Sequence, residues 1–289
     1  MMSKIIDGRL VSKLVKENLK SILEKEKISP SLAVILVGND PSSLVYVKNK
    51  TNECLEVGIS PKDYYLPEET TEEQLLDLID KLNRDDSIDG ILVQLPLPKH
   101  IDTNKILNAI SPRKDVDGFH PENVGKLLIG TPFVEPCTPK GVIKLLEYYN
   151  ITIEGKRAVV IGRSNIVGKP MAVMLLHRNA TVTVCHSKSQ NIPEITSQAD
   201  ILVSAVGIPN FVKPNMVKNG AVVIDIGINR IEENGKSRLV GDVEFDSVKE
   251  VASFITPVPG GVGLMTRAML LENTINLAIY KKLSGNKSL

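Results

Sequence analysis

A lysine on the apolar side of a predicted helix is the best candidate in this chain for proton chemistry. Residues 42–57 have helical periodicity. At about 100° per residue, one side of this helix carries four mostly apolar side chains, those of Ser43, Val47, Cys54 and Val57. Lys50 falls on the same side, and so does Tyr46, one turn before it. A lysine that faces apolar groups loses hydration, so we expect its pKa to fall and the amine to exchange protons near neutral pH. The alternative is that Lys50 extends along its stem to reach solvent.

Two further polar candidates lie in other segments. Gln94 interrupts the apolar strand 90–98 (GILVQLPLP), where a buried amide must find hydrogen-bond partners. It is therefore either a core residue or a group that positions a neighbour. The loop 113–121 (RKDVDGFHP) contains Asp115 and Asp117. Aspartate before glycine usually serves a turn, so a turn role is the alternative to ligand binding here.

The segment 159–170 (VVIGRSNIVGKP) places a glycine-bounded loop between a predicted strand and a predicted helix. Backbone N–H groups and a helix N-terminus in this context can bind the phosphates of a dinucleotide. The spacing departs from GxGxxG: Gly162 is present, Ser164 occupies the second glycine position, and Gly168 comes one residue late. An ordinary tight turn between strand and helix is the alternative.

The next strand favours NADP over NAD. An NAD site usually has an Asp or Glu after its second strand to bind the ribose hydroxyls. Here the strand ends in Cys185-His186-Ser187-Lys188, without an acidic residue, and Arg163 lies in the preceding loop. Arginine, serine and lysine at one point suit a 2′-phosphate. For Lys188, a solvated surface charge is an equally good explanation.

Composition excludes several classes of partner. The chain has 289 residues, of which 42% are hydrophobic and 24% charged, as in a soluble globular protein with about two domains. Lysine plus arginine number 35 against 34 acidic residues, so the net charge of +1 predicts neither a nucleic-acid nor a membrane partner. We therefore expect a small-molecule ligand, with any positive charge confined to its site.

Cysteine usage and the N-terminus favour the cytoplasm. The three cysteines are far apart and form no CxxC pair, so we expect neither a disulfide framework nor a metal site. No apolar run is long enough to span a bilayer. Charged residues lie where a signal peptide would need unbroken apolar sequence: Lys4, Asp7, Arg9 and Lys13.

Predicted strands and helices alternate along most of the chain. We expect strands at 31–38, 90–98, 157–162, 181–187, 200–207 and 221–227. We expect helices at 9–26, 42–57, 71–82, 138–149, 168–178 and 265–282. This alternation predicts an α/β fold with parallel sheets.

The weakest periodicity, near 120–138, predicts the junction between two α/β domains. We expect residues 1–138, joined by the C-terminal helix 264–289, to form the substrate domain. Residues 139–263 should form a Rossmann-like, doubly wound dinucleotide-binding domain, with the active-site cleft between the two.

Nine segments together resemble the bifunctional methylenetetrahydrofolate dehydrogenase/cyclohydrolase family. They occur in the family's order and cover nearly the whole chain: VGNDPSSLVYVKNK, DGILVQLPLP, KDVDGFHPENVG, PCTPKGV, VVIGRSNIVGKP, TVTVCHSKS, VVIDIGIN, VGDVEF and TPVPGGVG. Each segment alone is weak evidence for the family, but nine segments in the same order are specific for it. One departure is Leu264, which stands where the family usually has the proline of GGVGPMT. Loss of a proline that would fix φ is expected to loosen the start of the last helix.

The resemblance implies a role for each matching position of the folate site. Lys50 matches the catalytic lysine, Gln94 the glutamine that holds it, and Tyr46 the tyrosine that packs on the folate rings. Asp117 matches the aspartate that binds the pterin, and Ser43 a serine of the same helix. Gly260 and Gly261 belong to the TPVPGGVG segment that lines the substrate cleft.

For the cofactor, the resemblance implies NADP bound by residues from several loops. These are Gly162, Arg163, Ser164, Gly168, Ser187 and Ile228, with Arg163 and Ser187 near the 2′-phosphate.

The implied activity is oxidation of 5,10-methylenetetrahydrofolate by NADP, followed by hydrolysis of the methenyl product to 10-formyltetrahydrofolate. This places the protein in one-carbon metabolism and purine biosynthesis, as a cytoplasmic homodimer. Two alternatives remain: a monofunctional dehydrogenase with little cyclohydrolase activity, and a nucleotide-sensing module without catalysis. Tyr46, Lys50, Gln94 and Asp117 argue against the sensor, which has no use for a proton relay.

Overall fold

The computed structural model describes residues 3–233 and 236–285, and the chain divides into two compact units. One comprises Leu14–Glu135 and Leu270–Leu289 and is called the three-stranded unit after its sheet. The other comprises Met1–Lys13 and Pro136–Met269 and is called the six-stranded unit. Residues 1–2 and 286–289, which belong to the expected substrate domain, lie outside the described residues.

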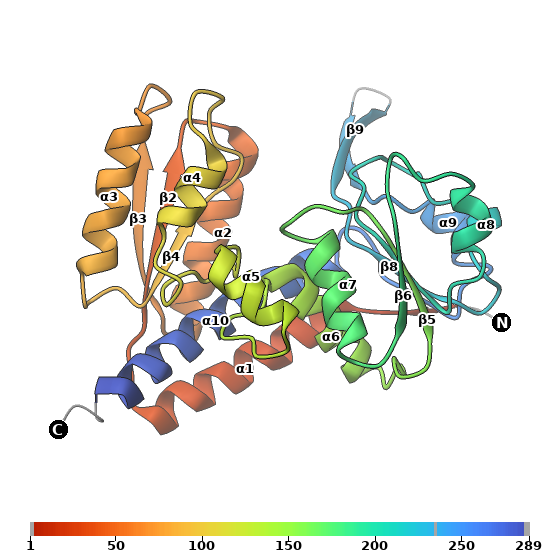
Figure 1. Ribbon diagram of the computed structural model, residues 1–289, viewed down its shortest axis with the longest axis horizontal. Coiled ribbons are helices and arrows are strands. Elements are labelled where there is room, and N and C mark those ends of the chain that lie inside the picture. Colours follow the sequence, from red (N-terminus) through yellow and green to blue (C-terminus); the bar gives the residue numbers. More distant parts are fainter. Residues whose placement is uncertain (1–2, 234–235, 286–289) are drawn as a thin grey trace. The chain divides into compact units, whose positions relative to one another are not determined.

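The sheet of the three-stranded unit is parallel, with strand order β3-β2-β4 (Figure 1). Its strands are β2 (Ser31–Val37), β3 (Ser60–Leu66) and β4 (Gly90–Val93). Every residue of the central strand β2 is buried, as expected for a parallel strand covered on both faces. The helices that link the strands are α2 (Pro41–Val57) and α3 (Glu72–Arg84).

Three expectations for this unit need correction. β4 ends at Val93, before Gln94 and well before the prolines expected to stop it. The edge strand β3 was not expected, because SPKDYYL lacks an apolar run and is mostly half-buried. The segment of weakest periodicity, near 120–138, contains the helix α5 (Pro121–Leu128), and the helix α4 (Thr103–Ala109) was not expected either.

Local capping explains why α5 forms despite its weak periodicity. Pro121 occupies the first helical turn, where its missing N–H costs nothing. The backbone N–H of Glu122 donates to Nδ1 of the capping residue His120 at 3.1 Å. A short helix with a glycine at position 125 leaves little periodic signal in the sequence.

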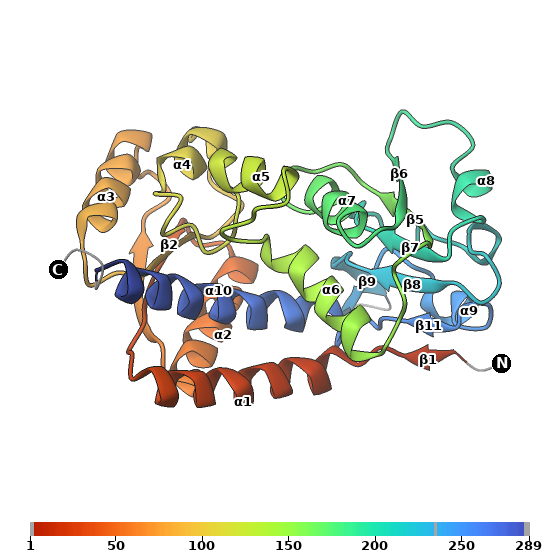
Figure 2. The same ribbon diagram turned by 60° about the horizontal axis from the view of Figure 1, so that its bottom comes forward.

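The six-stranded unit contains a fully parallel sheet with order β1-β11-β8-β7-β5-β6. Its strands are β1 (Lys4–Ile5), β5 (Arg157–Ile161), β6 (Thr181–Cys185), β7 (Ile201–Ser204), β8 (Val222–Asp225) and β11 (Phe254–Ile255). Its helices include α6 (Cys137–Tyr148), α7 (Gly168–Leu176), α8 (Ile192–Thr196) and α9 (Phe245–Val248), with α6 beside α7 (Figure 2). The expected strands 157–162, 181–187, 200–207 and 221–227 are each present in slightly shorter form. Strands β1 and β11 are too short to be expected from sequence.

An antiparallel pair and two long helices complete the chain. The pair β9 (Asn229–Glu233) and β10 (Lys236–Val240) was not expected. Helices α1 (Gly8–Glu26) and α10 (Val262–Gly285) each contribute residues to both units. Since α10 begins at Val262, Leu264 lies in its first turn, where backbone N–H groups have no partner within the helix.

Both sheets contain a point at which the strand order reverses. In the three-stranded sheet, β3 and β4 lie on opposite sides of β2, and in the six-stranded sheet, β6 and β7 lie on opposite sides of β5. In open α/β sheets, ligands bind outside the carboxyl ends of the strands at such a switch point. The topology therefore selects the segments after β2 and β4 in one unit, and those after β5 and β7 in the other.

Candidate active site

The amine of Lys50 donates a hydrogen bond to Oε1 of Gln94 at 2.9 Å. Lys50 is half-buried on α2, and Gln94 directly follows β4, at the switch point of the three-stranded sheet. The other end of the amide is also held, because Nε2 of Gln94 donates to the Leu95 carbonyl at 2.6 Å. Its backbone N–H continues the ladder by donating to the Ile35 carbonyl at 2.8 Å. The amine is therefore directed to a fixed acceptor at the carboxyl end of the sheet.

Helix α2 is anchored firmly enough to hold this amine in place. At its start, the backbone N–H of Ser43 donates to the Asp40 carboxylate at 2.7 Å. In its middle, the Thr51 hydroxyl donates to Asp63 of β3 at 2.8 Å. At its end, Gly58 has φ +104° and donates its N–H to the Cys54 carbonyl. A residue with a side chain is strained at that φ, so glycine is needed to end the helix here.

The buried face of α2 agrees with the sequence pattern. Val47 and Cys54 are fully buried, Ser43 is buried, and Tyr46 is half-buried. Burial, and secondarily the nearby Asp63 carboxylate, raises the pKa of the Cys54 thiol to about 12. This thiol therefore stays neutral and is not a nucleophile.

The two aspartates of the loop after α4 have different environments. Asp115 is 3% exposed, and its carboxylate accepts hydrogen bonds from the backbone N–H groups of Gly118 and His120 and from the Asn123 amide, at 2.8 to 3.0 Å. The turn role therefore belongs to Asp115. Asp115 also pairs in parallel with Ile91 of β4, which places this point of the loop beside that strand. Asp117 is half-buried two residues further along the same loop.

The glycines of the phosphate loop are required by close backbone contacts. Gly162 follows β5 with φ +121°, and a Cβ there would lie 2.4 Å from the Ala205 carbonyl oxygen after β7. A Cβ on Gly168 would lie 2.3 Å from the Gly162 carbonyl oxygen. Ser164 closes the loop, since its hydroxyl accepts from the N–H groups of Val167 and Gly168 at 3.1 and 3.2 Å. Gly168, which comes one residue later than in GxGxxG, therefore allows α7 to pack closely against the loop.

Arg163 and Ser187 lie at the same level of the six-stranded sheet. Ile161 of β5 and Cys185 of β6 are paired in register, and each candidate follows its strand end by two residues. Arg163, Ser164 and Ser187 are exposed, as is the neighbouring Lys188. Exposed guanidinium and hydroxyl groups beside a tight glycine loop fit a dinucleotide that carries an additional phosphate.

The remaining candidates also lie in the six-stranded unit. Ile228, which follows β8, is 45% exposed. Gly260 accepts a hydrogen bond from the backbone N–H of Gly8 at 2.9 Å, and a Cβ on Gly8 would lie 2.1 Å from the Gly261 carbonyl oxygen. The two glycines thus pack against the start of α1 and belong to a different unit from Lys50.

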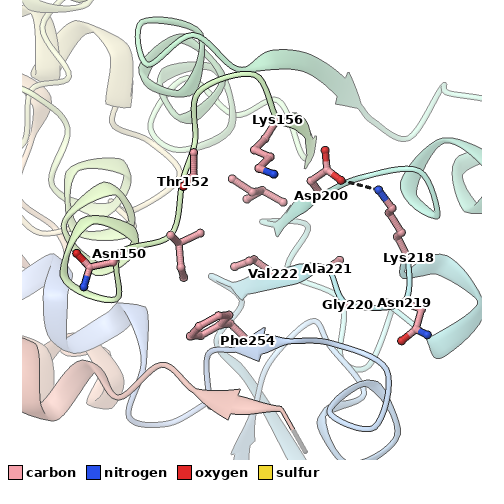
Figure 3. A pocket seen from close by; sticks show the side chains of 12 residues that line it. Asn150, Thr152, Lys156, Asp200, Lys218, Asn219, Gly220, Ala221, Val222 and Phe254 are labelled. Atoms are coloured by element: carbon pink, nitrogen blue, oxygen red, sulfur yellow. Dashed lines mark hydrogen bonds and ion pairs between the residues drawn. The ribbon is translucent and has the colours of Figure 1, made fainter. Parts of the chain in front are cut away.

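A cavity of about 360 Å³ lies at the opposite, amino-terminal edge of the six-stranded sheet (Figure 3). Its lining includes Lys156, Phe254 and an ion pair between Lys218 and Asp200 at 2.6 Å. None of the site residues expected from sequence lines it. Because dinucleotides bind at the carboxyl ends of parallel strands, this cavity is not assigned to the cofactor.

Two other kinds of feature, a metal-binding cluster and a membrane-spanning helix, are absent from the described part of the chain. Residues 3–233 and 236–285 contain no cluster of three or more His, Cys, Asp or Glu side chains that could hold a metal ion. Over the same residues, the helices all lack the length or the apolar character needed to cross a membrane.

Comparison with known proteins identifies the family of this chain. Residues 6–117 match the model of the tetrahydrofolate dehydrogenase/cyclohydrolase catalytic domain, and residues 136–282 match that of the family's NAD(P)-binding domain. The chain belongs to the tetrahydrofolate dehydrogenase/cyclohydrolase family. The two matched segments correspond broadly to the units with the folate candidates and with the phosphate loop.

Individual members of the family are similar over nearly their full length. The bifunctional protein FolD of Acetivibrio thermocellus is 58% identical over 281 residues, which cover 96% of this chain and 98% of the relative. The crystal structure of the bifunctional FolD from Campylobacter jejuni has a TM-score of 0.93 at 52% identity, with 96% and 99% of the two chains covered. The FolD of Trypanosoma brucei, solved with NADP cofactor and an inhibitor, has a TM-score of 0.93 at 39% identity, with 97% and 99% covered.

These similarities confirm the predicted family, the two-domain α/β fold, the bifunctional dehydrogenase/cyclohydrolase activity and the NADP cofactor. The bifunctional activity is thereby favoured over the monofunctional alternative. The roles of individual residues and the domain boundaries stay predictions.

The six-stranded unit also contains a pair of buried aspartates that was not expected from the sequence. Asp225, 3% exposed, ends β8, and Asp242, fully buried, follows β10. Burial raises the pKa of Asp225 to about 7, and the Asp242 carboxylate adds to this effect, whereas hydrogen bonds from three backbone N–H groups oppose it. An aspartate that ends an apolar strand was the only sequence signal for this pair.

The raised pKa of Asp225 predicts that the protein loses stability as the pH rises toward neutrality. An unfolded aspartate ionises near 3.8, so between that pH and about 7 unfolding releases a proton, and the free energy of unfolding falls. The expected loss from about pH 5.5 to pH 7 is about 2 kcal/mol. Asp225→Asn should flatten this dependence in denaturant unfolding, whereas the exposed Asp246→Asn should not. The same slope in wild type and Asp225→Asn would contradict the assignment.

Proposed function

We propose that Lys50 is the proton relay for the hydrolytic folate step and that Gln94 positions it. The observation that carries this proposal is the 2.9 Å hydrogen bond between the two side chains at the carboxyl end of the three-stranded sheet. The amide accepts from the amine and is fixed through its own donor to Leu95. Gln94 therefore restricts where the amine can deliver or collect a proton.

The dehydrogenase step transfers a hydride from the methylene carbon of the folate to NADP⁺. When bound, the cofactor supplies the hydride acceptor, and the protein must hold the two carbons in contact. In this proposal Tyr46, one turn before Lys50, packs on the folate rings, and Asp117, in the loop after α4, binds the pterin. Ser43, in the first turn of α2, also contacts the folate. The family resemblance alone supports Gly260 and Gly261 as further substrate-binding residues.

The hydrolytic step adds water to the methenyl cation and opens the ring to 10-formyltetrahydrofolate. A neutral Lys50 amine accepts the proton of the attacking water and returns one to the departing nitrogen. A charged amine would repel the cation, so the neutral form favours both steps.

In this proposal, the phosphates that link the two halves of NADP bind at Gly162, Ser164 and Gly168. Arg163 and Ser187, at one level of neighbouring strands, bind the 2′-phosphate and give the preference for NADP over NAD. Ile228, exposed after β8, contacts the nicotinamide end.

We assign residues 1–138 with 264–289 to folate binding and residues 139–263 to NADP binding. The family resemblance further supports a cytoplasmic homodimer that supplies formyl groups for purine biosynthesis.

Lys50→Met should abolish the hydrolysis of methenyltetrahydrofolate, with a loss of at least about 100-fold, because the methionine cannot carry a proton. The assay follows methenyltetrahydrofolate absorbance without cofactor. Lys48→Met, an exposed position on the same helix, is the matched control and should retain activity. Wild-type turnover in Lys50→Met would show that the relay assignment is wrong.

Arg163→Ala should raise the KM for NADP⁺ about 10- to 100-fold, since a charge-assisted bond to phosphate is lost, and leave the KM for NAD⁺ unchanged. Folate-dependent reduction of each cofactor gives both values. Arg157→Ala is the control, because Arg157 starts the same strand β5 at the opposite edge of the sheet. If the KM for NADP⁺ and the KM for NAD⁺ were each the same in Arg163→Ala as in wild type, the phosphate contact would be ruled out.

A further inference from the structure

Asp242 is fully buried, and its carboxylate accepts hydrogen bonds from five donors in two separate segments. The donors are the Ser204 hydroxyl, the backbone N–H groups of Val206, Gly207 and Ile208, and the Asn229 amide, at 2.7 to 3.2 Å. The first four belong to the end of β7 and the segment after it. The fifth belongs to the segment after the neighbouring strand β8. One carboxylate thus joins the loops that follow two adjacent parallel strands.

These two loops flank the place where the cofactor must lie. Gly162, after β5, leaves no room for a Cβ because of the Ala205 carbonyl, which directly precedes the three N–H groups bound by Asp242. The exposed Ile228 lies between two residues that touch the same carboxylate. Asn229 donates to its Oδ1, and a Cβ on Gly227 would lie 2.1 Å from that oxygen.

Asp242 is itself held by Asp225. The Asp242 backbone N–H donates to Oδ1 of Asp225 and that of Val243 to Oδ2, both at 2.9 Å. The Gly227 N–H donates to the same Oδ1, also at 2.9 Å. The Asp242 carbonyl in turn accepts the Val212 N–H at 2.9 Å. The carboxylate is therefore fixed from its own backbone and cannot turn away from the loops it holds.

We propose that Asp242 is a positioning residue for the nicotinamide half of NADP, acting through the segments 205–208 and 226–229. This inference rests on the proposed function, which places the 2′-phosphate near β5 and β6. A dinucleotide crosses the switch point of the sheet, so its other half lies over β7 and β8, whose loops Asp242 sets. Asp242 does not touch the cofactor. It fixes the backbone of the loop after β7 and the residues on both sides of Ile228.

Asp242→Asn is a stringent test because no orientation of the amide can replace the carboxylate. Oδ2 accepts from the N–H groups of Val206 and Gly207, and Oδ1 accepts from the Ile208 N–H and the Asn229 amide. Whichever oxygen is replaced by NH₂, that NH₂ group faces N–H donors of the protein, and the loop must shift. Shifts of about 1 Å in groups that position a substrate can cost about 100-fold in rate.

The experiment measures both activities of the full-length protein. In Asp242→Asn, the KM for NADP⁺ should rise at least about tenfold. The KM for methylenetetrahydrofolate and the cofactor-free hydrolysis of methenyltetrahydrofolate should stay within about twofold, because Lys50, Gln94 and Asp117 lie in the three-stranded unit and Asp242 does not. Asp246→Asn, an exposed position four residues further on, is the control and should match wild type.

Two results would overturn the proposal: an unchanged KM for NADP⁺, or a parallel loss of both activities, which would indicate a role only in folding. If Asp242→Asn does not fold, Asn229→Ala decides, because it removes one donor and leaves the carboxylate in place. It should raise the KM for NADP⁺ several-fold, and wild-type cofactor kinetics would contradict the proposal. Failure of the proposed 2′-phosphate placement is distinguishable, since it would appear as unchanged KM values in Arg163→Ala.

Discussion

The hydrogen bond from the Lys50 amine to the Gln94 side chain joins the first helix after β2 to the end of β4. It depends on the parallel arrangement of the sheet, because β4 lies beside β2 on the side opposite β3. The remainder of the three-stranded unit holds this contact in place. The Asp40 cap and the Thr51–Asp63 bond position α2, and the amide is held by Leu95. A long, flexible lysine side chain thereby acquires a defined end point.

In the six-stranded unit, too, specific contacts fix the segments at the carboxyl ends of the strands, but most of these contacts involve the backbone. The glycine loop after β5 packs against the segment after β7 at a distance that excludes any side chain on Gly162. The buried pair Asp225 and Asp242 then fixes the loops after β7 and β8 through backbone N–H donors. Burying two carboxylates is costly, and their hydrogen bonds offset that cost only in part, since the pKa of Asp225 is still raised to about 7. Such a network specifies loop conformation rather than adding much net stability.

The sequence was informative where a residue broke a local pattern. Lys50 on an apolar helix face and Gln94 in an apolar strand both stood out, and the structure brings them together. The order of strands and helices followed from periodicity, since parallel strands buried on both faces are short apolar runs. The resemblance of nine segments to one family supplied what single motifs could not, because the glycine loop alone departs from the usual spacing.

Features that depend on contacts distant in sequence could not be predicted in this way. The edge strand β3 has a half-buried, polar sequence, so its pairing with β2 decides its conformation. Asp242 looks like an ordinary turn residue after β10, yet its partners lie as far away as Ser204. Asp117 directly precedes glycine and was the expected turn residue, yet the loop geometry gives the turn role to Asp115.

A double-mutant cycle on the hydrolysis of methenyltetrahydrofolate tests whether Gln94 acts through the amine of Lys50. The cycle compares Gln94→Ala in the wild-type and in the Lys50→Met background. If the two side chains act as one unit, Gln94→Ala lowers the rate in the wild-type background and has almost no effect in the Lys50→Met background. An equal fractional loss in both backgrounds would show that Gln94 acts independently of the amine, and would contradict the account.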